Sequence, residues 1–176
     1  MEQLVMRWKN DGKPIENIVF PQFVTVKNWK EANNPLDKWL DICSYGLTEK
    51  KEDEQYYNTC NYKYENYKPE DCWFFCYKGE EVATVTVICD DKSKEGYIHM
   101  VAAKDSARGK GIGNLMSVFA VGELKRRKME TAYLTTDDFR IPAIKSYIKG
   151  GFYADLSTED FRDRWDKIFK IIGFKQ

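Results

Sequence analysis

The stretch that decides the fold is Ala107-Arg108-Gly109-Lys110-Gly111-Ile112-Gly113-Asn114-Leu115-Met116. Its three glycines, at alternate positions, remove Cβ atoms that would block close approach, and they permit backbone angles that aim successive N–H groups inward. Apolar residues at helical spacing over 112–128 predict a helix whose N-terminus adds partial positive charge. Arg108 and Lys110 add full charges. The stretch therefore predicts a cradle for phosphate or pyrophosphate.

Two other glycine-rich motifs do not fit this stretch. A P-loop has Ser or Thr after its Gly-Lys pair, whereas Gly111 follows Lys110 here. The dinucleotide motif Gly-x-Gly-x-x-Gly would need a third glycine where Asn114 or Met116 stands. On the stretch alone, the alternative to a cradle is a tight strand-to-helix turn that binds nothing.

Strand and helix signals surround the stretch on both sides. Before it, a hairpin of 73–77 and 82–89 around Lys78-Gly79, followed by a strand at 97–103, indicates an antiparallel meander. After it come a strand at 132–135, a helix over 142–149 and a strand that starts at Phe152. The acidic capping signal Ser157-Thr158-Glu159-Asp160 opens an amphipathic helix over 157–172.

The N-terminal part has weaker signals. Two short extended pieces are expected at 4–8 and 23–27, and a helix over 36–43 has Pro35 in its first turn. The charged, tyrosine-rich segment 48–70 has no clean period, so it either shapes the mouth of a pocket or is an ordinary surface connection. The whole pattern predicts one α+β (mixed α/β) domain over 1–176, built on a largely antiparallel sheet.

Composition excludes several classes of protein. The 28 basic and 28 acidic residues cancel, so no basic excess points to nucleic acid or to an anionic membrane. No run approaches the about 20 apolar residues that a membrane span needs, and the first residues lack an apolar signal core, so we expect a cytoplasmic protein. None of the five cysteines has metal-ligand spacing with another, so we expect reduced structural thiols and no metal.

With these elements in place, the sequence resembles the GNAT N-acetyltransferase superfamily in two blocks. Arg108, Gly111 and Gly113 fit the acetyl-CoA motif Arg/Gln-x-x-Gly-x-Gly/Ala, and Tyr147 to Phe152 is similar to the Tyr-x-x-x-Gly-Phe end of the family's helix after its fifth strand. The form Asp-Asp-Phe-Arg-x-Pro-Ala over 137–143 locally resembles the mycothiol-synthase-like branch. The resemblance covers about 73–153.

The resemblance implies a fold, a donor and a set of contacts. It implies a twisted sheet that splays between the family's fourth and fifth strands, here 97–103 and 132–135, with acetyl-CoA held by 73–153 and the acceptor met by 1–70. The pantetheine arm would pair with backbone groups of the fourth strand. The implied cofactor contacts are Val101, Ala102, Ala103, Arg108, Gly109, Lys110, Gly111, Ile112, Gly113, Asn114, Arg140 and Tyr147.

Two residues are candidates for proton transfer in a direct attack of a neutral amine on the thioester. Tyr147 matches the family tyrosine that protonates the leaving thiolate; the alternative is an aromatic residue that fills the core. Strand alternation places the only histidine, His99, on the same face as Tyr97, Val101 and Ala103. There it is either a general base or a hydrogen-bonded structural histidine.

Three departures from the family pattern affect the site. Arg140 stands where most relatives have an Asn that contacts pantetheine. Its side chain would instead reach either a phosphate or an acidic substrate. Asp137 and Asp138 either bind a cationic amine or face the dipole of the next helix. A helix over 157–172 stands where relatives usually have a seventh strand, which is therefore replaced or displaced.

These features predict an enzyme that moves acetyl from acetyl-CoA to a primary amine, with a small molecule as acceptor. The alternatives are a CoA-binding sensor that has lost turnover and a protein-interaction module that uses 48–70. Tyr147 favours the enzyme over the sensor. A second copy of the chain, in a homodimer, is a further candidate partner.

Overall fold

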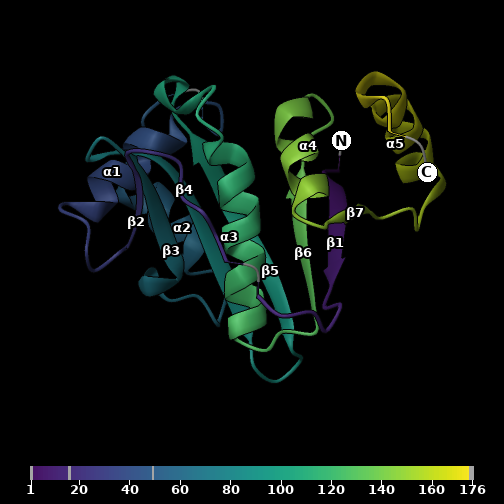
Figure 1. Ribbon diagram of the computed structural model, residues 1–176, viewed down its shortest axis with the longest axis horizontal. Helices are drawn as coiled ribbons and strands as arrows, with labels where there is room; N and C mark the ends of the chain where they lie inside the picture. Colours follow the sequence, from purple (N-terminus) through teal and green to yellow (C-terminus); the bar gives the residue numbers. More distant parts are fainter. Residues whose placement is uncertain (1, 16, 49, 175–176) are drawn as a thin grey trace.

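A computed structural model describes residues 2–15, 17–48 and 50–174 of the chain. Its seven strands form one sheet in the order β2-β3-β4-β5-β6-β1-β7 (Figure 1). The strands are β1 Leu4–Lys9, β2 Val24–Asn28, β3 Cys72–Tyr77, β4 Glu80–Asp90, β5 Glu95–Ala103, β6 Thr131–Thr136 and β7 Tyr153–Ala154. All neighbouring strands are antiparallel except β5 and β6, so the predicted mixed α/β fold on a mostly antiparallel sheet is confirmed.

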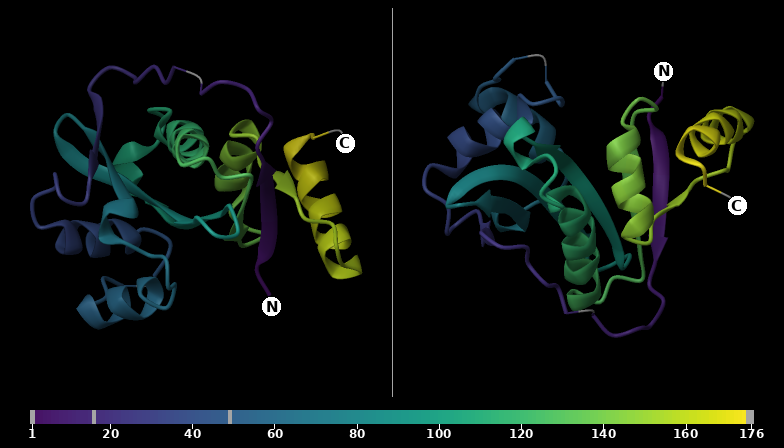
Figure 2. Two further views of the ribbon diagram at one scale, coloured as in Figure 1. Left: turned by 90° about the horizontal axis from the view of Figure 1, so that it is seen from below. Right: turned by 45° about the horizontal axis from the view of Figure 1, so that its top comes forward.

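Helices cover both faces of this sheet. The helices are α1 Pro35–Cys43, α2 Glu54–Asn61, α3 Ile112–Arg126, α4 Ile141–Lys149 and α5 Glu159–Ile172, with short 3₁₀ turns at Pro69–Asp71 and Asp105–Ala107. Figure 2 shows α3 and α4 on one face and α1 and α2 on the other, while α5 lies beside β1 and β7. Two buried apolar clusters, one under α3 and α4 and one under α1 and α2, follow from this layering. No helix in the described ranges is long and apolar enough to cross a membrane.

The predicted helices are present with boundaries shifted by few residues. Pro35 stands at the start of α1, as expected. Thr158 caps α5, where its Oγ1 accepts a hydrogen bond of 3.1 Å from the backbone N–H of Phe161. The aperiodic segment 48–70 contains α2, whose N-cap Asp53 accepts a hydrogen bond from the backbone N–H of Tyr56. This helix buries few residues, which is why its sequence shows no apolar period.

A β-bulge interrupts β5 where the strand passes the gap in the sheet. Thr84 of β4 pairs with Ala102, but Thr86 pairs with His99, so β5 holds one residue more than β4 between these pairs. The backbone at Met100 is left-handed, with φ 49°, which accommodates the extra residue. The bulge therefore changes which side chains share a face of the strand.

The prediction that His99 shares a face with Val101 and Ala103 is wrong for this reason. Tyr97 packs on the α1–α2 side with His99, whereas Val101 and Ala103 pack against the cluster under α3. Strict period-two alternation holds only in an unbroken strand, and the extra residue reverses it beyond the bulge. The shared face of Tyr97 and His99, which precede the bulge, is confirmed.

The sheet splays between β5 and β6, as expected. The two strands pair in parallel only from Glu95 with Thr131 to Ile98 with Leu134, and they separate beyond that point. The edge of β5 that faces the gap is therefore unpaired from His99 to the end of the strand. This opening is where the two cavities described below lie.

The backbone of Ala103 faces that opening. The N–H of Lys104 donates to the carbonyl oxygen of Val82 in β4 at 2.8 Å. Because consecutive residues of a strand point their backbone groups to opposite edges, the N–H and C=O of Ala103 point away from β4. They are available to an extended ligand that runs along β5.

The N-terminal strand supplies a central strand of the second half-sheet. β1 pairs antiparallel with β6, from Leu4 with Thr136 to Lys9 with Thr131, and on its other side with β7. The last element of the described residues is α5, as the sequence predicts, and their sheet still has seven strands because β1 is inserted between β6 and β7.

Candidate active site

Two adjoining cavities occupy the gap between β5 and β6. The first, of about 410 Å³, lies between the end of β5 and the N-terminus of α3. The second, of about 520 Å³, lies between β5, β6 and the residues of α2. Val101, Arg140, Ala143 and Tyr147 line both cavities. A ligand in one cavity can therefore meet a ligand in the other beside these four side chains.

The glycine-rich turn opens onto the first cavity. Gly109 and Gly111 have φ of 72° and 74°, and a Cβ on either would meet no atom within 4 Å, so the space above both is free. No side chain caps α3, and the first N–H groups of a helix have no partner inside it. Ile112, Gly113 and Asn114 thus direct free N–H groups toward an anion, which fits the predicted cradle.

The structure brings the predicted cofactor residues together, with one exception. All of them line the first cavity except Lys110, whose Nζ lies 4.8 Å above the ring of Tyr77. Arg108 borders the cavity, but its guanidinium forms an exposed ion pair of 2.8 Å with Asp105. The backbone, rather than these two side chains, forms the lining of the turn in this arrangement.

Tyr147 projects from α4 to the place where the cavities meet. The side chain is buried, and burial raises the pKa of its hydroxyl above the usual value. A phenol with a raised pKa is fully protonated at neutral pH and can donate a proton. The position and the protonation state both suit a general acid that acts on a group shared by the two cavities.

His99 lines the second cavity and is held by two hydrogen bonds. Its Nε2 lies 3.1 Å from the carbonyl oxygen of Cys60, which can only accept, so Nε2 carries the proton. Nδ1 then accepts from the Tyr97 hydroxyl at 3.3 Å. Burial lowers the pKa of His99 to about 4 and keeps the ring uncharged at neutral pH. Both ring nitrogens are therefore engaged in the free protein.

Aromatic residues that the sequence did not single out line the second cavity. Tyr56 and Tyr64 come from α2 and the turn that follows it, whereas Tyr97 and Tyr133 come from β5 and β6. The rings of Tyr97 and Tyr133 stack with centroids 4.6 Å apart. The concentration of tyrosine in 48–70 was the only signal in the sequence that could have indicated this wall.

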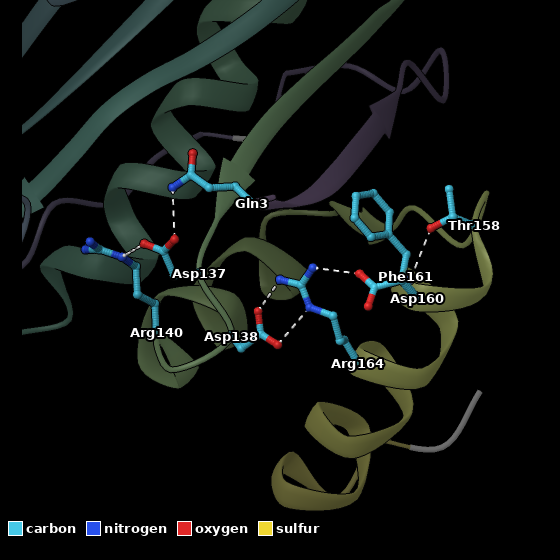
Figure 3. Close-up of polar contacts among 8 residues, drawn as sticks. All are labelled: Gln3, Asp137, Asp138, Arg140, Thr158, Asp160, Phe161 and Arg164. Atoms are coloured by element: carbon cyan, nitrogen blue, oxygen red, sulfur yellow. Dashed lines mark hydrogen bonds and ion pairs between the residues drawn. The ribbon is translucent and has the colours of Figure 1, made fainter. Parts of the chain in front are cut away.

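The acidic pair before α4 is engaged by arginines (Figure 3). Asp137 accepts from Nε of Arg140 at 2.7 Å and from the Gln3 amide at 3.1 Å. Asp138 pairs with Arg164 of α5, whose hydrogen bond holds the pKa of Asp138 below the usual value. Neither carboxylate lines either cavity. Their positions therefore fit a structural role, in which they fix Arg140 and attach α5.

A splayed sheet, an anion cradle at a helix N-terminus and a tyrosine between two cavities define an acyltransferase-like architecture. Residues 33–152 match the model of the Acetyltransferase (GNAT) family, and the chain belongs to this family. No match was found among curated proteins.

Solved structures of family members have the same fold. A GCN5-related N-acetyltransferase from Sphaerobacter thermophilus aligns over 88% of this chain and 48% of its own, with TM-score 0.69 and 18% identity. The ribosomal-protein-S18-alanine N-acetyltransferase of Escherichia coli aligns over 74% and 77%, with TM-score 0.59 and 17% identity. An acetyltransferase of Bacillus subtilis, solved in complex with CoA, aligns over 74% and 76%, with TM-score 0.55 and 18% identity. The chain spans about half the length of the first of these.

Proposed function

We propose that this protein transfers acetyl from acetyl-CoA to a small primary amine. The observation that carries the proposal is that Tyr147 lies at the junction of two cavities, one with an anion cradle and one with an aromatic wall. The first would hold the donor and the second the acceptor. The block Asp137–Ala143 supports, within the same proposal, a place in the mycothiol-synthase-like branch.

The first cavity fits the chemical parts of acetyl-CoA. The N–H groups at Gly111 to Asn114 suit a pyrophosphate, and the open edge of β5 suits the amides of a pantetheine arm. Ala102 and Ala103 leave room beside that edge. When bound, acetyl-CoA would supply the activated acyl thioester.

Residues of this chain would carry out the proton transfers. Tyr147, which burial keeps protonated, would donate its hydroxyl proton to the leaving sulfur and would recover a proton from the acceptor nitrogen as that nitrogen becomes an amide. The ammonium proton of the acceptor would pass to the Tyr97 oxygen while the Tyr97 proton moves to Nδ1 of His99. With a pKa of about 4, His99 would hold that proton only briefly before it reaches solvent.

The five cysteines are consistent with a cytoplasmic enzyme, which we include in the proposal. All five are free thiols in the structure, and free thiols are typical of a reducing compartment.

Release of CoA from acetyl-CoA, measured over a panel of amines, tests the proposed function. Tyr147→Phe should keep the rise in melting temperature that acetyl-CoA produces and should lower kcat by about a hundredfold, the usual range for loss of a general acid. Tyr153→Phe is the matched control, because Tyr153 is an exposed tyrosine on β7 outside both cavities. Equal kcat in the two variants would show that another group donates the proton.

A further inference from the structure

The second cavity has a consistent charge. Its charged lining side chains are Lys63 and Arg140, both positive, and no carboxylate belongs to the lining among the described residues. A cavity that selects a polycationic amine needs acidic groups to replace water around each ammonium. The positive side chains of this cavity instead favour a ligand with an anionic group.

Both cations keep hydrogen-bonding capacity free. Arg140 uses Nε for Asp137, and Figure 3 shows its terminal nitrogens directed away from that carboxylate. Lys63 forms no ion pair within the described part of the chain, and its Nζ lies 5.0 Å over the ring of Tyr64, between this cavity and a neighbouring hollow. Glu65 and Glu95 border a neighbouring hollow, on the other side of Tyr64 and Tyr97. Neither carboxylate lines this cavity, so the charge of Lys63 is unpaired there, while Asp137 offsets part of the charge of Arg140 from outside the lining.

Flat aromatic surfaces form a large part of the wall. Tyr64 lies 5.1 Å from Tyr97 and 5.0 Å from His99, measured between ring centroids, and Tyr97 stacks on Tyr133. Rings of this kind can attract either another ring or a cation. Because Lys63 already occupies one ring face as a cation, a neutral ring is the better occupant.

We propose that the acceptor is a primary amine that also carries a carboxylate and a flat ring, as in an aromatic amino acid. This inference rests on the proposed function and specifies its acceptor. The carboxylate would be held by Lys63 and Arg140 and the ring by the tyrosines. The same two cations would lower the pKa of the bound ammonium, which increases the fraction of neutral amine that can attack.

Three aromatic amines that differ only at the carboxylate, together with a diamine, test the inference. Phenylalanine should give a kcat/KM at least about tenfold above that of phenethylamine, which lacks the carboxylate, and above that of phenylalaninamide, because hydrogen bonds to charged groups contribute that much. Putrescine, a dication, should be the poorest acceptor. Equal or higher kcat/KM with phenethylamine or putrescine would overturn the inference.

Substitution of Lys63 supplies an independent test. Lys63→Met should raise KM for phenylalanine by up to about fivefold and leave KM for phenethylamine nearly unchanged, as expected for loss of an exposed charge pair. Lys92→Met, at an exposed lysine in the β4–β5 turn, should change neither value. A uniform change in both KM values would contradict a charge-specific contact.

Different results would refute the proposed function and the inference about its acceptor. If acetyl-CoA neither raises the melting temperature nor releases CoA with any amine, the proposed function fails. If acetyl-CoA binds and CoA is released, but Kd values measured with CoA present show no preference of the protein for phenylalanine over phenethylamine, only the acceptor inference fails.

Discussion

The cradle at Gly111 allows a test in which the cost in stability and the loss of binding are measured separately. Gly111 has φ 74° and open space beyond its hydrogen, so a side chain there would strain the backbone without striking the protein. The left-handed conformation costs about 1–2 kcal/mol for a residue with a Cβ. For a chain of this size that lowers the melting temperature by about 2–8 °C.

The effect of the substitution on ligand binding is larger than its effect on stability. At a hundredfold excess over Kd, acetyl-CoA should stabilise the native protein by about 2.7 kcal/mol, a rise of about 5–11 °C. Gly111→Glu would place a carboxylate beside the pyrophosphate, and one such like-charge pair at 4 Å costs about 4 kcal/mol near a protein surface. That repulsion exceeds the stabilisation, so the rise should vanish.

Thermal melts with and without acetyl-CoA measure both quantities. Gly12→Glu is the matched control, because Gly12 has φ 71°, equally open space and a position in the turn after β1. Both variants should lose similar stability without ligand, but only Gly12→Glu should keep the rise. If Gly111→Glu also keeps it, the pyrophosphate does not lie over this turn.

The remaining predictions concern pH and a buried ion pair. Burial lowers the pKa of His99 to about 4, below the about 6.5 of an unfolded histidine, so the unfolded state binds more protons between these values and stability falls as pH drops through them. From pH 7 to pH 5 the free energy of unfolding, measured in urea, should fall by about 2 kcal/mol. His99→Gln should abolish this fall, since the chain has no other histidine. An equal fall in that variant would assign the pH dependence to another group. Arg127→Met should lower stability by about 3–5 kcal/mol, because buried Asp71 would lose the guanidinium 2.6 Å away. Lys92→Met is its control, and a similar melting temperature for the two variants would contradict the role of the ion pair.

The donor side of the site is local in the sequence, which is why residues alone could predict it. The glycines, the cap-free helix N-terminus and the preceding strand lie within 97–116, so backbone preferences and short-range pattern define their geometry. The side chain of Lys110 is the exception. It lies outside the cavity, over the ring of Tyr77 in β3, and a contact between separate segments is not visible in a local pattern.

The acceptor side is built from distant segments, and the sequence alone could not assemble it. Tyr97 and Tyr133 are partners across β5 and β6, but Tyr56 and Tyr64 reach them only because α2 and the turn after it fold over β5. The bulge at Met100 was equally hidden, since 97–103 is apolar at nearly every position and a shift in the alternation leaves no mark there. The placement of β1 depends on pairing with β6, which strand propensity does not specify.

The position of β1 has a consequence for how the chain assembles. During synthesis β1 emerges well before its partner β6, because β2 to β5 and α1 to α3 lie between them in the chain. Until then β1 has an apolar face and two unpaired edges, the features that invite aggregation. Long-range pairing of this kind also slows folding. The half of the sheet beyond the cavities should therefore form last, and the cavity between the halves should be completed in the same late event.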